Sequence, residues 1–266
     1  MVAIERARVL AGAVPFSAGN VNDTYRGMVL LGGGARRHGI IKDLNLEQLV
    51  NELLATILGK ELGLPLPDAF LGIVPNGILA VSKLRLADGS GHLVFVSGDV
   101  GTPNLAQQVT GKGSAAALAL INLLRQWNKL GDLYAFDAWI ANTDRHPGNL
   151  LIEGPSNIWM IDHGHAFTGP DWKPKDLDPV AEYRNALYGW LTNYLSPTDK
   201  SDKGKDVGVF ATKIARVGIP QAMNDSLVPL LLKPEVAEAI KDFLMQRVQY
   251  VPNQAKKALG MPVLVP

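Results

Sequence analysis

Residues 136–167 read FDAWIANTDRHPGNLLIEGPSNIWMIDHGHAF, and this stretch limits the choice of fold more than any other. An apolar helix is expected to end at Asn142, and a polar loop that contains Asp144 follows it. Asn149 opens a short strand, a Gly-Pro turn reverses the chain, and a second strand ends at Asp162. Because a hairpin brings its two outer ends together, we expect these polar side chains to lie close to one another.

Three of these side chains suit a metal–phosphate site. Mg²⁺ prefers hard oxygen ligands and keeps several waters, so one carboxylate and one amide oxygen suffice beside the phosphates of a substrate. A further aspartate near the metal can orient or deprotonate an acceptor hydroxyl. Taken singly, Asp144, Asn149 and Asp162 could each be an ordinary turn residue. Their combination on one helix, loop and hairpin favours the functional interpretation.

The same segment resembles a family of atypical kinases. Residues 142–149, NTDRHPGN, are similar to the catalytic loop of the HipA-type serine/threonine kinases, and Asp-Arg-His also resembles the equivalent loop of phosphatidylinositol kinases. Residues 162–164, Asp-His-Gly, resemble the metal-binding motif of that superfamily. The resemblance implies an α+β, bilobal, protein-kinase-like fold. It also implies roles for four residues, namely catalysis by Asp144 and His146 and Mg²⁺ binding by Asn149 and Asp162.

A kinase also needs a lysine on a strand of its first lobe and a glutamate on the next helix. Lys42 stands in a strand expected over residues 38–44, and Glu52 lies in a helix expected over residues 46–62. Leucines flank Glu52 at helical spacing, which predicts that it faces inward, whereas Glu47 lies near the start of the helix. The order of elements favours an ion pair in which Glu52 holds Lys42 against the phosphates of ATP.

The loop before the first expected hairpin is the candidate phosphate-binding loop. It contains Ser17, Gly19 and Asn20, and the backbone N–H groups of such a turn can bind phosphate without a special side chain. A single glycine with small polar neighbours is similar to the short loops of the phosphatidylinositol and HipA-type kinases. The triple glycine at residues 32–34 is a hairpin turn that no helix follows, so we do not expect it to bind phosphate.

The chain divides into three parts on this interpretation. Residues 1–86 form a β-rich N-lobe that binds the nucleotide, residues 87–113 form a glycine-rich connection, and residues 114–266 form a helical C-lobe with the catalytic loop and metal site. A strand is expected over residues 77–84, so that the backbone of residues 82–86 reads the edge of the adenine. The HipA-type kinases carry an additional N-terminal subdomain, for which this chain is too short.

Composition narrows the chemistry further. The 266 residues include 26 Lys and Arg and 25 Asp and Glu, and the net charge of +1 is too small to direct the molecule to nucleic acid. The absence of cysteine excludes disulfides, thiolate metal sites and a cysteine nucleophile. No apolar run is long enough for a membrane span and no signal peptide is visible, so a cytoplasmic protein is expected.

These observations predict an ATP-dependent phosphotransferase that uses Mg²⁺. A serine/threonine protein is the first expectation for the acceptor, and a lipid or small-molecule acceptor, or transfer of AMP, are alternatives within the same fold. A regulatory protein partner is left open. Two alternatives change the class: an inactive nucleotide-binding interaction module, and a metallohydrolase built on His146, His163 and His165. The chain lacks the paired histidine motifs that a metallohydrolase of the common helical type would use.

Overall fold

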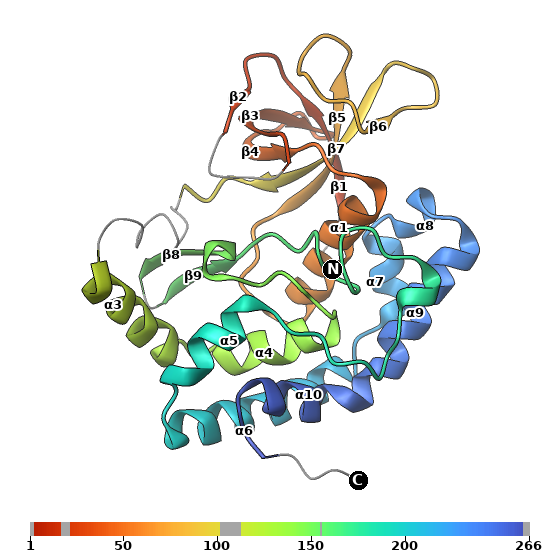
Figure 1. The fold of residues 1–266 in the computed structure, drawn as a ribbon. Helices are drawn as coiled ribbons and strands as arrows, with labels where there is room; N and C mark the ends of the chain where they lie inside the picture. Colours follow the sequence, from red (N-terminus) through yellow and green to blue (C-terminus); the bar gives the residue numbers. More distant parts are fainter. Residues whose placement is uncertain (1–2, 17–21, 102–112, 155, 263–266) are drawn as a thin grey trace.

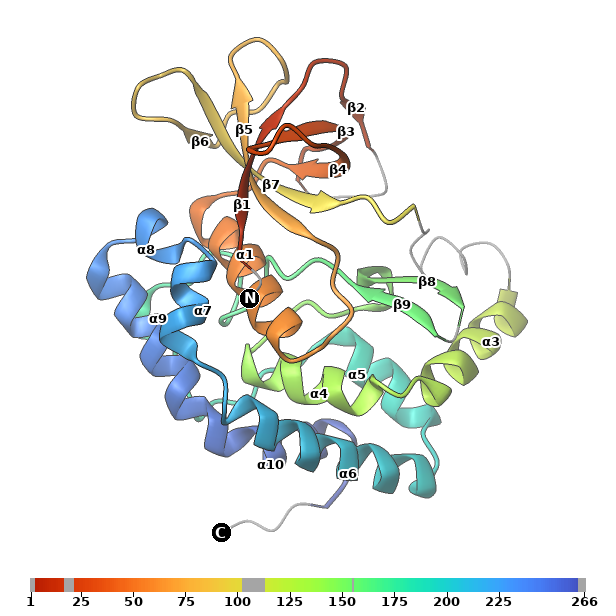
Figure 2. The same ribbon diagram turned by 180° about the vertical axis from the view of Figure 1, so that it is seen from behind.

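The computed structural model describes residues 3–16, 22–101, 113–154 and 156–262. The fold is mixed α+β, with a sheet-rich N-terminal part and a helical C-terminal part (Figure 1). Helix α1 (Leu46–Glu61) lies between the sheet and the remaining helices, as the view from behind also shows (Figure 2). This arrangement agrees with the expected α+β class.

Seven strands form one sheet in the N-terminal part. They are β1 (Glu5–Val9), β2 (Val14–Pro15), β3 (Thr24–Leu31), β4 (Arg36–Lys42), β5 (Ala69–Pro75), β6 (Leu84–Arg85) and β7 (Gly91–Gly98). Strand β1 pairs antiparallel with β3 and parallel with β5, so β1, β5, β7, β4 and β3 close into a five-stranded barrel. The short strands β2 and β6 extend the sheet beside β3 and β7.

The barrel has its own apolar core. Alternate residues along each strand point to the same face, so every second side chain turns inward. The buried members of this core are Ala7, Val9, Val29, Ile41, Phe70, Val74, Val81, Val94 and Val96. The closed barrel was not predicted from the sequence, because closure depends on β1 pairing at both of its edges.

The prediction of a strand over residues 77–84 is wrong. Only β6, at the end of that range, pairs with the sheet, and β7 forms instead inside the segment expected to be a loop. Strand β7 pairs with β4 on one side and β5 on the other. Its glycines suggested a loop, but Gly91 permits a close approach of two strands, because a Cβ there would lie 2.2 Å from the carbonyl oxygen of Val74.

Helix α1 is buried on nearly all sides. It begins at Leu46, where the N-cap Asn45 accepts a hydrogen bond from the Gln48 N–H, and it ends before Gly63, which has φ of +75°. One side of α1 packs against β5 and β7, and another packs against α7 (Ile219–Asp225) and α8 (Val228–Leu231). The helix therefore belongs to both parts of the molecule.

The C-terminal part combines a short hairpin with helices. The hairpin consists of β8 (Leu150–Gly154) and β9 (Asn157–Met160). The other α-helices among the described residues are α3 (Gly113–Gln126), α4 (Leu130–Trp139), α5 (Ala186–Leu191), α6 (Pro197–Ile214), α9 (Pro234–Arg247) and α10 (Val251–Ala258).

Helix α4 is the centre of the helical part, since all of its residues are buried. Helices α6 and α10 pack against it, and the Trp139 Nε1–H donates to the carbonyl oxygen of Leu244 at 3.0 Å. The apolar positions of α4 surround the whole helix rather than one face, which is typical of a core helix. Within the described residues, no helix has the length and apolar character that crossing a bilayer requires.

Candidate active site

A lysine between two carboxylates joins the sheet to the helical part. Lys42 is the last residue of β4, and its Nζ lies 2.8 Å from Glu52 Oε1 and 3.0 Å from Asp162 Oδ1. Glu52 comes from α1, and Asp162 follows β9. The Glu52 side chain is 3% exposed and that of Asp162 is 44% exposed, so the group runs from the core to an open surface. The predicted ion pair between Lys42 and Glu52 is confirmed.

The charges of this group stabilise one another. Burial alone would lower the pKa of Lys42, but the Asp162 and Glu52 carboxylates raise it well above its ordinary value. Burial alone would raise the pKa of Glu52, but the Lys42 ammonium and a hydrogen bond from His163 hold it well below its ordinary value. Lys42 and Glu52 are therefore both charged at neutral pH.

Glu52 also holds the backbone after Asp162. Its second oxygen, Oε2, accepts a hydrogen bond from the His163 N–H at 2.9 Å. The His163 ring is buried, and burial together with the Arg145 guanidinium lowers its pKa, so the ring is neutral at neutral pH. One carboxylate of α1 thus fixes both Lys42 and the residue that follows Asp162.

A buried ion pair fixes the loop over residues 142–149. Arg145 donates from Nε and Nη2 to the two carboxylate oxygens of Asp137, at 2.9 and 3.1 Å, and neither side chain is exposed. Its Nη1 donates to the carbonyl oxygens of Asn149 and Ile161, at 3.2 and 2.7 Å. Bidentate pairing of this kind is rigid, so Arg145 ties the loop to α4 and to both ends of the hairpin.

Asn149 and Asp162 lie at neighbouring positions of the hairpin ends. The Ile161 N–H donates to the carbonyl oxygen of Asn149 at 3.1 Å, which places Asp162 one residue beyond. The Asn149 Nδ2 donates to the carbonyl oxygen of Asp144 at 2.9 Å, so its amide oxygen is turned away from that bond. Asp162 has φ of +61°, a left-handed conformation that directs the chain out of the strand.

The donor set fits a hard divalent cation. The Asn149 amide oxygen and an Asp162 carboxylate oxygen are not used in any hydrogen bond that we find in the described part of the chain. Oxygens of this kind are the ligands that Mg²⁺ prefers. Asp144 is exposed, so its carboxylate is open to solvent. Its backbone N–H donates to the Asn142 Oδ1 at 3.2 Å.

His146 has a structural contact. Its Nδ1 accepts a hydrogen bond from the Gly148 N–H at 3.0 Å and caps the short 3₁₀ helix Pro147–Asn149. Because Nδ1 accepts, the neutral ring carries its proton on Nε2. No group of three or more His, Asp or Glu side chains with metal-binding geometry occurs among the described residues.

The predicted phosphate-binding loop and the segment expected to read adenine have different outcomes. Ser17, Gly19 and Asn20 lie outside the described residues. The backbone N–H groups of Ser82 and Lys83, in the segment expected to read adenine, donate instead to the Asp43 carboxylate, at 2.9 and 3.4 Å. The segment over residues 87–113, expected to be a loop-rich connection, contains β7, which belongs to the sheet of the N-terminal part.

Sequence reasoning missed two buried residues of this region, Asp137 and Asn51. Asp137 stands in the middle of the apolar helix α4, where a buried carboxylate predicts a partner of opposite charge. Asn51 precedes Glu52 on α1 and is fully buried. An asparagine within an apolar helix face indicates a specific hydrogen-bonded role, but the sequence alone does not say with which groups.

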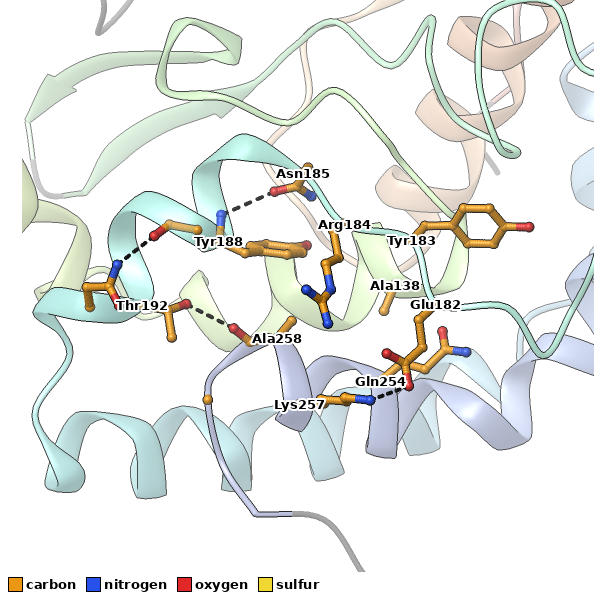
Figure 3. A pocket seen from close by; sticks show the side chains of 13 residues that line it. Ala138, Glu182, Tyr183, Arg184, Asn185, Tyr188, Thr192, Gln254, Lys257 and Ala258 are labelled. Atoms are coloured by element: carbon orange, nitrogen blue, oxygen red, sulfur yellow. Dashed lines mark hydrogen bonds and ion pairs between the residues drawn. The ribbon is translucent and has the colours of Figure 1, made fainter. Parts of the chain in front are cut away.

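A separate cavity of about 410 Å³ lies in the helical part, between α5, α10 and the chain before α5 (Figure 3). Its walls include Arg184, Tyr188, Gln254 and Lys257, and none of the predicted site residues lines it. It is therefore not part of the candidate active site.

The barrel and the helical part meet at the Lys42–Glu52–Asp162 group, and a match to known sequences shows the class of protein: a kinase. Residues 39–178 match the model of the HipA-like kinase family, and this range is more than half of the chain. The chain therefore belongs to the HipA-like kinases.

A solved structure supports the fold. The chain is similar to the Helicobacter pylori proinflammatory kinase CtkA, with a TM-score of 0.56 and 14% sequence identity. The similarity covers 96% of this chain and 98% of that one. At this identity the likeness concerns the fold alone. No curated protein sequence matches this chain.

Proposed function

We propose that this chain is a Mg²⁺- and ATP-dependent phosphotransferase with a bilobal protein-kinase-like fold, and that its acceptor is a serine or threonine hydroxyl of a protein. The observation that carries this proposal is the contact of Lys42 Nζ with both Glu52 and Asp162. Phosphoryl transfer needs a cation for the phosphates beside a carboxylate for the metal, and this group supplies both.

Each residue has a definite task in this proposal. Lys42 binds the phosphates of ATP, and Glu52 holds the ammonium of Lys42 in place. Asn149 and Asp162 would hold Mg²⁺, which neutralises phosphate charge when bound. Asp144 accepts the proton of the acceptor hydroxyl, because its carboxylate is open to solvent on a loop that Arg145 keeps rigid. His146 shapes that loop through its cap on the 3₁₀ turn.

The nucleotide is proposed to lie between the two parts of the chain. Ser17, Gly19 and Asn20 would cover its phosphates with backbone N–H groups. The proposed division, first placed after residue 86, moves to the end of β7 at Gly98, so that residues 1–98 form the nucleotide-binding lobe, the connection follows, and residues 114–266 form the helical lobe. Since β7 extends the sheet to Gly98, the adenine edge is proposed to meet the backbone after β7.

The choice of a protein acceptor rests on the family to which the chain belongs. A lipid or small-molecule acceptor uses the same Lys, Glu, Asp and Asn set, so it remains the second candidate for the acceptor. Transfer of AMP would also use this set but would leave the α-phosphate on the acceptor. The position of the label on ATP separates these reactions.

The test is a transfer assay with ATP labelled at the γ- or the α-phosphate, with Mg²⁺ and a cell lysate. Label from γ-ATP is expected on protein, and label from α-ATP is not. Asp144→Asn and Asp162→Asn should each reduce transfer about 100-fold or more, whereas Asp202→Asn, the same change on the exposed face of α6, should leave it unchanged. Transfer from α-ATP alone would indicate AMP transfer.

Binding separates the inactive module from the enzyme. A protein that binds Mg²⁺ and ATP with the affinity of an enzyme but transfers neither label would be a nucleotide-binding interaction module. A protein that does not bind ATP would contradict the proposal altogether.

A further inference from the structure

One buried amide on α1 contacts the chain segment that follows Asp162. The Asn51 Nδ2 donates to the carbonyl oxygens of Gly164, Ala166 and Gly169, at 2.8, 2.9 and 3.0 Å. Its Oδ1 accepts from the Trp172 Nε1–H at 2.8 Å. Asn51 is 0% exposed. Its amide hydrogens and its oxygen are thus all used on a segment more than a hundred positions away.

This segment, residues 163–172, adopts an irregular and costly backbone. Phe167 and Thr168 have φ of +51° and +81°, which residues other than glycine rarely adopt. Their N–H groups donate to the carbonyl oxygens of Ile140 and Ala141, at 2.6 and 3.2 Å. The segment is therefore bound to the end of α4 through its N–H groups and to α1 through its carbonyl groups. Without Asn51, buried carbonyl groups would lose their donor.

We propose that Asn51 is a positioning residue that holds residues 163–172 in this arrangement and so keeps Asp162 beside Lys42. Asn51 and Glu52 are neighbours on α1, and both bind backbone groups of this segment. Trp172 completes the contact from the far end of the segment. The effect on the order of the segment is independent of catalysis, and the effect on catalysis rests on the proposed function.

Only an amide meets the requirement at position 51. The side chain must donate to carbonyl oxygens on one side and accept from the indole N–H on the other. Aspartate has the same shape but offers no N–H, and it places a negative charge against three carbonyl oxygens. Trp172→Phe keeps an aromatic ring but removes the single donor to Asn51. These two variants perturb opposite ends of the contact.

The first measurement is hydrogen exchange of the protein without ligand, which does not depend on any activity. Asn51→Asp is expected to raise exchange in residues 163–172 at least tenfold, and Trp172→Phe is expected to raise it less. Asn76→Asp is the matched control, because Asn76 also donates its amide to a carbonyl, that of Gly89, in an exposed turn of the barrel. Unchanged exchange in both variants would overturn the proposal.

The second measurement is ATP turnover as a function of Mg²⁺ concentration. Asn51→Asp is expected to raise the Mg²⁺ concentration for half-maximal turnover about tenfold or more, because Asp162 loses its position. Ile240→Ala, a core change in α9, is expected to lower the melting temperature without raising the Mg²⁺ concentration for half-maximal turnover. If it raised the Mg²⁺ requirement equally, Asn51 would be merely structural.

The two measurements also separate the two proposals. A wild-type protein without ATP turnover would contradict the proposed function, while hydrogen exchange would still decide the role of Asn51. If Asn51→Asp does not fold, Trp172→Phe decides, because it removes one hydrogen bond and keeps most of the buried ring area. Equal exchange of residues 163–172 in wild type and Trp172→Phe would then contradict the proposal.

Discussion

At the scale of single residues, the site depends on charges that are buried in pairs. Lys42 lies between two carboxylates, and Arg145 lies against the Asp137 carboxylate with no exposure on either side chain. A buried ion pair contributes little net stability compared with an apolar pair, but a single unpaired partner is strongly destabilising. These pairs therefore make the geometry specific, and the loss of one member should be costly.

The Arg145–Asp137 pair gives a direct test of this argument. Arg145→Met should lower the free energy of unfolding by about 3–5 kcal/mol, because it leaves the Asp137 carboxylate buried and unpaired. The double variant Arg145→Met/Asp137→Leu should recover much of that loss, since it buries no charge. Urea unfolding measures both values. Recovery in stability without recovery of ATP turnover would separate the structural and the positioning effects of Arg145, and a double variant less stable than the single one would contradict the argument.

The lowered pKa of Glu52 predicts a pH dependence. A carboxyl group whose pKa is lower in the folded than in the unfolded state stabilises the fold fully above its unfolded value, 4.5. That contribution is lost as the pH falls below 4.5 toward the folded value. The difference in unfolding free energy between wild type and Glu52→Gln should therefore stay constant from about pH 6 to about pH 8, and it should shrink below pH 4.5. Urea unfolding across this range measures it, and a difference that grows on acidification would contradict the assigned direction.

At the scale of elements, the close contacts depend on small residues at defined positions. Gly131 on α4 faces α6 so closely that a Cβ would lie 2.7 Å from the carbonyl oxygen of Lys203. At Gly208 on α6, by contrast, an added Cβ would meet no atom within 4 Å. The two glycines therefore have different reasons for their presence, although the sequence does not distinguish them.

These glycines predict opposite effects of the same substitution. Gly131→Ala should destabilise the protein by about 1–3 kcal/mol, because α4 and α6 must move apart. Gly208→Ala should stabilise it by about 0.5–1 kcal/mol, because alanine loses less conformational entropy in a helix. Thermal unfolding of both variants measures the difference. A Gly131→Ala protein as stable as Gly208→Ala would show that the helices do not pack as closely as described.

The sequence predicted the elements with local signals well. The hairpin of β3 and β4, helix α1 and the loop before β8 all follow from periodicity, turn residues and caps within a few positions. Strand β7 was missed, because its glycines suggest a loop and its pairing with β4 and β5 depends on residues far along the chain. The contacts of Asn51 and Arg145 were missed for the same reason.

At the scale of the whole molecule, the site exists only where the two parts meet. Lys42 comes from the barrel, Glu52 from the helix that both parts share, and Asp162 from the hairpin of the helical part. A ligand that contacts all three would link the parts and stabilise the folded state, since it binds the folded chain and not the unfolded one.

Mg²⁺ and ATP together should therefore raise the melting temperature. The expected stabilisation is about 2.7 kcal/mol when the nucleotide is present at 100 times its Kd. Asp162→Asn should lose most of the Mg²⁺-dependent part, whereas Asp202→Asn should keep it. Thermal unfolding with ATP alone, with Mg²⁺ alone and with both separates the contributions. An equal rise in Asp162→Asn would contradict the placement of the metal.

The sequence by itself indicated the family, through the resemblance of residues 142–149 and 162–164 to the HipA-type kinases. It also offered the candidate lysine, glutamate, aspartates and asparagine, through their residue types and the order of the elements that carry them. Only the tertiary structure decided that the sheet closes into a barrel, that β7 completes it, and that Arg145 and Asn51 hold the loops around the site. Lys42 and Asp162 are 120 positions apart. Contacts over such separations depend on how buried surfaces pack and which polar groups then need partners, and no local pattern encodes that choice.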